Sequence, residues 1–434
     1  MLPDRPVPEI AERALAERAR LPTAYAALFE KIVREDAGLR SMCDPAWAWI
    51  EKELARLDSR LDAGLGRALA GVSLGVKDTI VVDGLPTKAG TGVDLGQLLP
   101  LKPSAAVVAL QDAGALVVGK QATHQFGSSA GPAGTRSLRG ADHYAGGSTV
   151  GGAVAVAAGF TALALGTDGG GSLRKPAALA GVAGLRPRKA TICGEGEVNG
   201  SVFGQSTGLI ARNTADIAAV LERCPNLLRA PLETERAGPL VVGIPRIARS
   251  VIAPAAERAL QAAADRLVRM GHAVASVPLW IDEAAGRDFM IAVQFDNWVF
   301  HASLLAAHPE IYAPAVARAM REGETIAPEA ADAARRRLAD HRARFLEEAL
   351  SQRIDLLLTP SVPWPDMRNG SASPQDLSAS AGRFTVLANI YDLDSVSLPL
   401  LREDGMIRSV MLTALGISLA TLLGCARQLE LAYA

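Results

Sequence analysis

Residues 145–187 read AGGSTVGGAVAVAAGFTALALGTDGGGSLRKPAALAGVAGLRP, and this stretch decides the fold. It holds two serines, Ser148 and Ser172, each in a run of glycines, with mostly small apolar residues between them. The pattern predicts a small-residue helix from Ser148, a strand over Thr161–Gly166, a loop in GTDGGGS and a helix over Leu173–Ala180. This strand–loop–helix rhythm is typical of an α/β sheet with helices on both faces.

The same rhythm extends toward the N-terminus. Residues 9–64 place Arg and Glu among Ala and Leu at helical spacing, which predicts two or three amphipathic helices. GVSLGVKD (71–78) predicts a short buried strand that ends on Lys77. A helix over Pro103–Ala113 and a strand over Ala115–Lys120 follow.

The C-terminal half continues the α/β pattern around one large mixed sheet. No internal repeat or long linker divides the chain, so we expect a single domain over residues 1–434. Within it, we expect N-terminal helices over residues 1–65, a core that holds both serines over 71–187, and the remaining sheet with a covering region over 238–434. The expected later elements are strands in PLVVGIP, HAVASVPL and IDLLLTP, paired strands in VSLPL and SVMLTAL, helices over Ala253–Met270, Pro328–Leu350 and Ile417–Leu431, and a polar loop over Gly370–Ser380.

Charge and cysteine content exclude several classes of protein. Lys and Arg number 45 against 46 Asp and Glu, and this near balance argues against nucleic acid or an anionic membrane as the main partner. The Arg-rich segment over Pro328–Leu350 also carries acidic residues, which favours a solvated helix face. The four cysteines have no CxxC spacing, so a zinc or redox motif is not indicated.

Two segments of the chain are apolar enough to be considered as membrane spans. Val150–Gly166 and Ser409–Cys425 are both shorter than the roughly 20 residues that a helical span needs. We therefore expect both to be buried core. The N-terminus mixes charges from the start and has no apolar signal-peptide core, which predicts a cytoplasmic protein.

The glycines before Ser172 suggest acyl-transfer chemistry. A serine becomes a nucleophile when a base removes its proton. Three glycines, Gly169, Gly170 and Gly171, let backbone N–H groups converge on the oxygen of a tetrahedral intermediate, where each donor is worth about 3–4 kcal/mol. The alternative is a glycine turn with Ser172 as a helix N-cap. A phosphate loop is disfavoured because no lysine precedes the serine.

Lys77 and Ser148 are candidates for the groups that remove the proton from Ser172. A lysine at the buried end of a strand loses charge to desolvation, and a pKa near 7 instead of about 10.4 would make it a base. A neutral Lys77 could take a proton from Ser148, which in turn takes one from Ser172. The alternatives are a helix cap for Ser148 and a surface pair of Lys77 with Asp78.

Three segments in this order resemble the amidase signature family. GVSLGVKD resembles its lysine segment, AGGSTVGGAVAVAAG its Gly-Gly-Ser-Ser-Gly stretch, and LALGTDGGGSLRKPAALAGVAGLRP its nucleophile segment. The resemblance covers roughly residues 10–432, with residues 71–187 carrying most of its specificity. It implies a linear-amide hydrolase that works through an acyl-enzyme without metal or cofactor, on a small-molecule amide.

The resemblance also implies a role for each site residue. Ser172 would be the nucleophile, Ser148 the proton shuttle after a cis Gly147–Ser148 peptide, and Lys77 the base. The oxyanion hole would be formed by backbone N–H groups of Gly169, Gly170, Gly171 and Ser172. Supporting residues would be Thr149, Asp168 and Arg174, and substrate contacts would come from Gly127, Ser128 and His124.

Several positions depart from the family pattern and leave the substrate open. Val150 stands in place of a usual glycine, Ala145 of a proline and Gln125 of a common glutamate. Asp392 and Asp394 lie in a segment that is often rich in Gly and Pro; these two and Arg408 are substrate contacts or, alternatively, loop charges. An amidotransferase acting with an amine acceptor or partner subunit also remains open, as do a homodimer and a non-catalytic scaffold.

Overall fold

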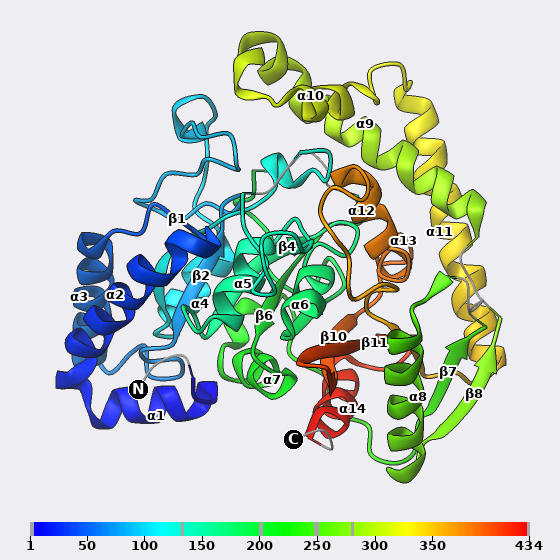
Figure 1. Ribbon diagram of the computed structural model, residues 1–434, viewed down its shortest axis with the longest axis horizontal. Coiled ribbons are helices and arrows are strands. Elements are labelled where there is room, and N and C mark those ends of the chain that lie inside the picture. The colour runs from blue at the N-terminus through cyan, green and yellow to red at the C-terminus, as the bar shows by residue number, and fades with distance from the viewer. Residues whose placement is uncertain (1–3, 132–133, 199–202, 247–250, 279–281, 432–434) are drawn as a thin grey trace.

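One mixed sheet of eleven strands crosses the computed structural model, which describes residues 4–131, 134–198, 203–246, 251–278 and 282–431 (Figure 1). The strand order is β1-β3-β2-β4-β6-β5-β10-β11-β9-β7-β8. Neighbours are parallel among β3, β2 and β4 and among β8, β7 and β9, and every other neighbouring pair is antiparallel. The strands are β1 (Met42–Cys43), β2 (Ser73–Lys77), β3 (Leu116–Gln121), β4 (Leu163–Asp168), β5 (Ala183–Arg186), β6 (Ser206–Ala211), β7 (Val241–Pro245), β8 (Ala273–Val277), β9 (Leu356–Pro360), β10 (Ser395–Glu403) and β11 (Met406–Ala414).

Helices cover both faces of the sheet, which confirms the predicted α/β class. Side chains alternate along β4: Ala164 packs with Ala153 of α5, whereas Leu163 and Leu165 pack in the larger core with Ile217 of α7. The α-helices are α1 (Val7–Ala16), α2 (Leu21–Leu39), α3 (Trp47–Asp62), α4 (Ala105–Asp112), α5 (Val150–Ala157), α6 (Arg174–Ala180), α7 (Thr214–Arg223), α8 (Pro254–Arg269), α9 (Glu283–Ala307), α10 (Pro314–Arg321), α11 (Pro328–Ser351), α12 (Pro374–Ala381), α13 (Val386–Ile390) and α14 (Leu419–Leu431).

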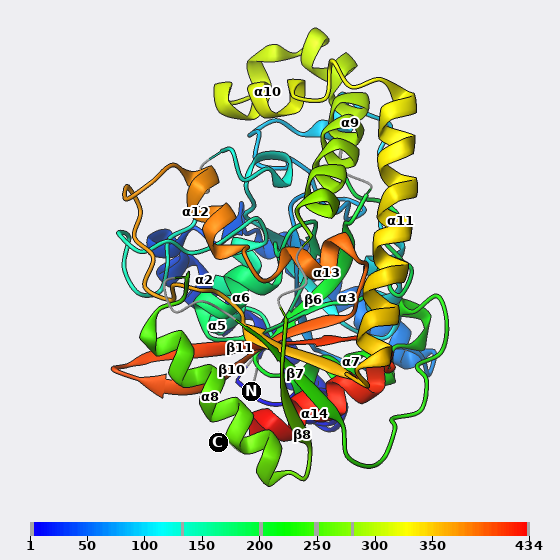
Figure 2. The ribbon, with the colours of Figure 1, turned by 90° about the vertical axis from the view of Figure 1, so that its right-hand side faces the viewer.

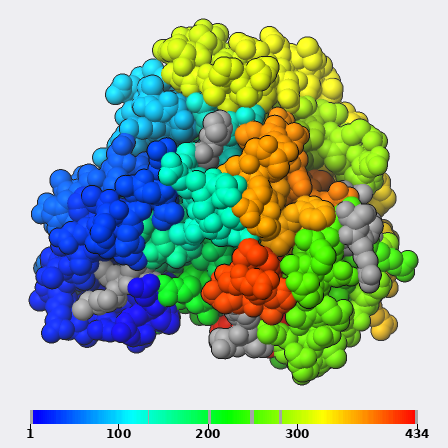
Figure 3. All heavy atoms as spheres, viewed as in Figure 1, coloured from blue at the N-terminus to red at the C-terminus, as the bar shows by residue number. Residues whose placement is uncertain are grey.

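The long helices α9 and α11 lie side by side and, with α10, extend beyond the sheet (Figure 2). In the space-filling view, α10 covers the upper end of the molecule above the α12 segment (Figure 3). Arginines of α11 pair within the protein: Arg335 with Asp296, and Arg337 with Asp288. These ion pairs hold α11 against α9. The three helices α9, α10 and α11 are called the cap below.

Two local predictions were wrong. Strand β4 continues through Thr167 and Asp168, because both pair in register with β6, so the glycine loop is shorter than expected. The polar loop expected over Gly370–Ser380 contains helix α12. Its start is specified by Ser373, whose Oγ accepts from Asp376 N at 3.1 Å, and by a proline in the first turn.

The apolar C-terminal segment is divided between two buried elements. Residues 409–414 belong to β11, and α14 begins at Leu419. The paired strands expected in VSLPL and SVMLTAL are antiparallel neighbours, with Val396 opposite Leu412. None of the helices in the described part of the chain has the length and apolarity to cross a bilayer.

Candidate active site

A cleft of about 450 Å³ opens where β4 ends and α6 begins. Its floor comes from the glycine-rich segments, and its walls come from α6, the α12 segment and the cap. Floor residues include Gly127, Ser128, Ser148, Thr167, Gly169, Gly170 and Ser172, and wall residues include Lys175, Phe289, Met290, Val293, Met320, Ser378 and Arg383.

Lys77 lies just beneath this floor at the end of β2. It is 1% exposed, and its Nζ lies 2.8 Å from Ser148 Oγ and 2.6 Å from Thr167 Oγ1. Burial lowers the pKa of Lys77 to about 8, while the carboxylates of Glu197 and Asp168 act in the opposite direction. The predicted buried lysine is therefore present, and it is not a surface partner of Asp78.

Ser148 follows a cis peptide bond, Gly147–Ser148, as the resemblance implies. Its hydroxyl faces Lys77 and the cleft, and its carbonyl accepts from Thr123 Oγ1 at 3.0 Å. The next residue, Thr149, donates its N–H to the Ser172 carbonyl at 3.1 Å. This bond holds the Ser148 and Ser172 segments together.

Ser172 is half-buried in the turn that leads into α6, and it lines the cleft with Ser148. Gly169 and Gly170 line the cleft beside it. Gly171 does not: its N–H donates to Asp168 Oδ1 at 2.7 Å. The Gly171 N–H is therefore already occupied, which leaves Gly169, Gly170 and Ser172 at the cleft surface.

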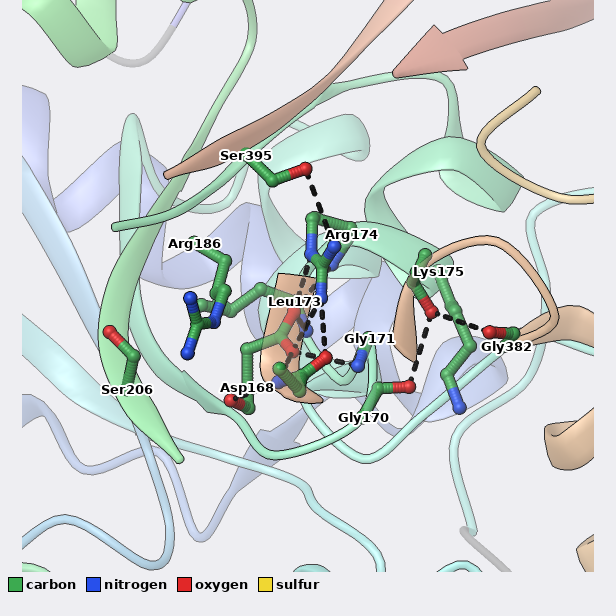
Figure 4. A network of polar contacts seen from close by, with 12 residues as sticks. Asp168, Gly170, Gly171, Leu173, Arg174, Lys175, Arg186, Ser206, Gly382 and Ser395 are labelled. Atoms are coloured by element: carbon green, nitrogen blue, oxygen red, sulfur yellow. Dashed lines mark hydrogen bonds and ion pairs between the residues drawn. The ribbon is translucent and has the colours of Figure 1, made fainter. Parts of the chain in front are cut away.

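A buried ion pair fixes the glycine loop (Figure 4). Both side chains are fully buried, and Arg174 donates to Asp168 through Nη2 at 2.9 Å and Nε at 3.0 Å. Asp168 also accepts from the N–H groups of Gly171 and Leu173. Asn389 donates to Asp168 Oδ1 at 2.9 Å. Burial alone raises the pKa of Asp168, but Arg174, together with Asn389 and Arg186, outweighs burial and holds that pKa well below its usual range.

Thr149 is a supporting residue, whereas His124 does not lie where a substrate contact would. The Thr149 hydroxyl donates to the Thr167 carbonyl at 3.0 Å, so it supports β4 and does not orient Ser148. His124 is buried behind the cis peptide, where a Cβ on Gly147 would overlap its ring, and it does not line the cleft. Burial lowers the pKa of His124 to about 4, which keeps the imidazole neutral.

Gly127 and Ser128 do line the cleft. Gly127 has a positive φ of 71°, and a Cβ there would lie 3.6 Å from Ser148 Oγ and 3.8 Å from Lys77 Nζ. A glycine at this position allows the loop to approach the Lys77–Ser148 pair closely.

The arrangement agrees with comparisons to known proteins. The amidase family model matches residues 24–423. The chain belongs to the amidase signature family. It is 31% identical over 397 residues to a glutamyl-tRNA(Gln) amidotransferase subunit of Deinococcus radiodurans, covering 80% of each chain. It is 29% identical over 368 residues to an amidase of Pseudomonas putida, covering 78% of this chain and 77% of that one. A crystal structure of an amidase matches 99% of this chain and 100% of that one with a TM-score of 0.86 and 24% identity.

Two positions that depart from the expected family pattern lie together in space. Val150 and Ala145 are both buried and pack in one small cluster with Val154. Val150 does not line the cleft, so it leaves the floor of the site intact.

The divergent charges near the C-terminus serve the fold. Asp392 accepts from Arg186 at 2.9 Å, and Asp394 pairs with Arg188 at 3.1 Å. Arg408 is buried beside Met406. None of Asp392, Asp394 and Arg408 lines the cleft, which favours the loop-charge interpretation.

Four residues of the site escaped sequence reasoning. Thr167 could have been found only with the knowledge that β4 continues to Asp168, because that places its side chain at the end of the strand. Glu197, which accepts hydrogen bonds from Thr207 and Gln205, and Asn389 come from distant segments with no local signal. Lys175 stood in the nucleophile segment, but only the fold shows that it faces the cleft.

Proposed function

We propose that this amidase signature protein hydrolyses a linear carboxylic amide through an acyl-enzyme on Ser172. The observation that carries the proposal is the buried Lys77 Nζ, 2.8 Å from Ser148 Oγ, beneath a cleft that Ser172 also lines. The relatives named amidase and amidotransferase support chemistry at amide bonds.

The proposed proton path runs from Ser172 through Ser148 to Lys77. Neutral Lys77 accepts the Ser148 proton, Ser148 accepts the Ser172 proton, and Ser172 Oγ forms a bond to the amide carbon. The N–H groups of Gly169, Gly170 and Ser172 stabilise the negative oxygen. The proton returns along the same path to the leaving nitrogen as the C–N bond breaks. Water then hydrolyses the ester and releases the acid.

The direct test is Ser172→Ala assayed for ammonia release from a panel of linear amides. We expect turnover to fall at least about 10⁴-fold, because the change removes the nucleophile. Circular dichroism and thermal melting should match the unchanged protein. Equal ammonia release by the variant would overturn the proposal.

A transferase is the second candidate, because several relatives are amidotransferase subunits. An acyl-enzyme can be attacked by an amine in place of water. Adding hydroxylamine and measuring hydroxamate against free acid separates the two reactions. Light scattering of the purified chain would show whether it acts alone, as a homodimer, or only with a partner of another kind.

A further inference from the structure

Lys175 is a buried lysine in the cleft wall that the proposed proton path does not use. It lies three residues after Ser172, and its N–H donates to the Gly171 carbonyl at 2.8 Å. One hydrogen-bonded turn, which leads into α6, therefore contains both Ser172 and Lys175.

The Lys175 ammonium lacks an anionic partner. Its Nζ donates to Ser378 Oγ at 2.8 Å and to the Ser378 carbonyl at 3.2 Å, both neutral oxygens on α12. Among the residues that the structure describes, no carboxylate lies within ion-pairing distance of Lys175, although the side chain is only 4% exposed. In Figure 4 the side chain extends away from the Asp168–Arg174 pair.

A buried charge normally requires a partner, and the cleft is where one can enter. An ammonium has three N–H donors, and Ser378 accepts two. Burial lowers the pKa of Lys175 to about 8, so the group still carries a proton at neutral pH. Since burying an unpaired charge is costly, an anion in the cleft would complete this site.

The remaining charges of the cleft agree with an anionic ligand. Arg383, just before α13, is exposed and lines the same wall, and its side chain has no partner in the described part of the chain. The acidic lining residue, Glu322, accepts from Gln294 Nε2 at 2.8 Å on the α9–α10 side. The two basic side chains, Lys175 and Arg383, thus lie on the α6–α12 side of the cleft, and the acidic side chain of Glu322 lies on the side of the cap.

We propose that the cleft takes amides whose acyl chain ends in a carboxylate, namely monoamides of short dicarboxylic acids. The carboxylate binds Lys175, and Arg383 attracts it at the mouth of the cleft. This inference rests on the proposed function, because it names the substrate class of the same site. Because Ser172 and Lys175 lie within one turn of the chain, short spacers are tested first, as in succinamate and glutaramate.

The test compares succinamate with butanamide, which has the same chain length and lacks the carboxylate. We expect the unchanged protein to prefer succinamate by kcat/KM, and Lys175→Met to lower the ratio of the two values about 10- to 100-fold. The exposed Lys102→Met is the matched control and should leave the ratio unchanged. Arg383→Gln, an exposed substitution that leaves the buried packing intact, should lower the ratio less and mainly at low salt.

A second measurement does not depend on the folding of Lys175→Met. Succinate should inhibit butanamide hydrolysis by the unchanged protein more strongly than butyrate at matched ionic strength, because only succinate carries the second carboxylate. Ser172-dependent hydrolysis without preference for succinamate, or equal inhibition by the two acids, overturns the inference and leaves the proposed function standing. Hydrolysis that persists in Ser172→Ala overturns the proposed function instead.

Discussion

Lys77 Nζ lies 2.8 Å from Ser148 Oγ, although 71 residues separate them in the chain. Strand β2 brings the lysine to the floor of the cleft, and the loop before α5 brings the serine. Both side chains are buried, so their contact excludes water and lowers the pKa of the amine. This contact makes the rate of the proposed reaction depend on the protonation of Lys77.

Lys77→Met should remove the base and the pH dependence together. Because burial lowers the pKa of Lys77 to about 8, kcat/KM of the unchanged protein should rise with pH up to about 8 and then level off. The variant should lose about 10²–10⁴-fold in kcat/KM and show no such rise. A pH–rate profile of each protein checks this, and an unchanged rise in the variant would contradict the role of Lys77.

The same lysine should shape stability at alkaline pH. Its pKa in the folded protein is below the unfolded value of about 10.4, so the unfolded chain binds more protons between about pH 8 and 10.4. The contribution of Lys77 therefore makes the free energy of unfolding rise with pH across this window. Urea unfolding at several pH values should show a smaller rise in Lys77→Met, and identical slopes would argue against a buried lysine.

Glu197→Gln should shift the activity profile to lower pH. The carboxylate of Glu197 raises the pKa of Lys77 against the effect of burial. Neutralising it should lower that pKa further and move the rising limb of kcat/KM in the acid direction. Glu195→Gln is the matched control, since Glu195 is exposed and pairs with Arg229. Equal shifts in the two variants would exclude a specific effect of Glu197.

Asp168→Asn should destabilise the fold strongly. The change leaves the Arg174 charge buried without its partner, which costs about 3–5 kcal/mol in the free energy of unfolding. Asp58→Asn, which breaks an exposed pair with Arg18, should have little effect. Urea unfolding at pH 7 measures both. Similar values for the two variants would show that the Asp168–Arg174 pair does not hold the loop.

Gln125→Glu should loosen the cap. The Gln125 amide donates to the Ile311 carbonyl at 2.9 Å and accepts from Ala313 N at 2.8 Å. A glutamate keeps the second bond and loses the first, which costs about 1 kcal/mol. Hydrogen exchange should quicken in residues 311–321 and stay unchanged in β2. Unchanged hydrogen exchange in both segments would show that the two Gln125 hydrogen bonds do not hold residues 311–321 in place.

Local sequence signals were sufficient for much of the fold. The apolar periodicity and the glycine and proline positions predicted the ends of β2 to β4, α5 and α6 to within a few residues. Each of these elements has its own hydrophobic period and is bounded by residues that break it. Helix α12 was missed because its polar surface resembles a loop, and only Ser373 and Pro374 mark its start. The continuation of β4 through Asp168 depends on pairing with β6, about 40 residues further along the chain.

The floor of the candidate site was easier to predict than its surroundings. Lys77, Ser148 and Ser172 lie in segments with distinctive neighbours, so spacing and resemblance located them. The direction of an N–H group has no such signal: Gly171 donates to Asp168, although its sequence setting equals that of Gly170. Asn389 reaches Asp168 across 221 residues, and only tertiary packing shows this contact.

Covalent labelling tests the central claim, attack by Ser172, most directly. The protein is incubated with a fluorophosphonate, which reacts with activated serines, and the adduct is located by peptide mass spectrometry while amide hydrolysis is followed in parallel. We expect one adduct, on Ser172, with loss of hydrolysis in proportion to labelling and no labelling of Lys77→Met or Ser172→Ala. An unlabelled Ser172 in a protein that still hydrolyses amides, or full labelling without loss of hydrolysis, would contradict the mechanism.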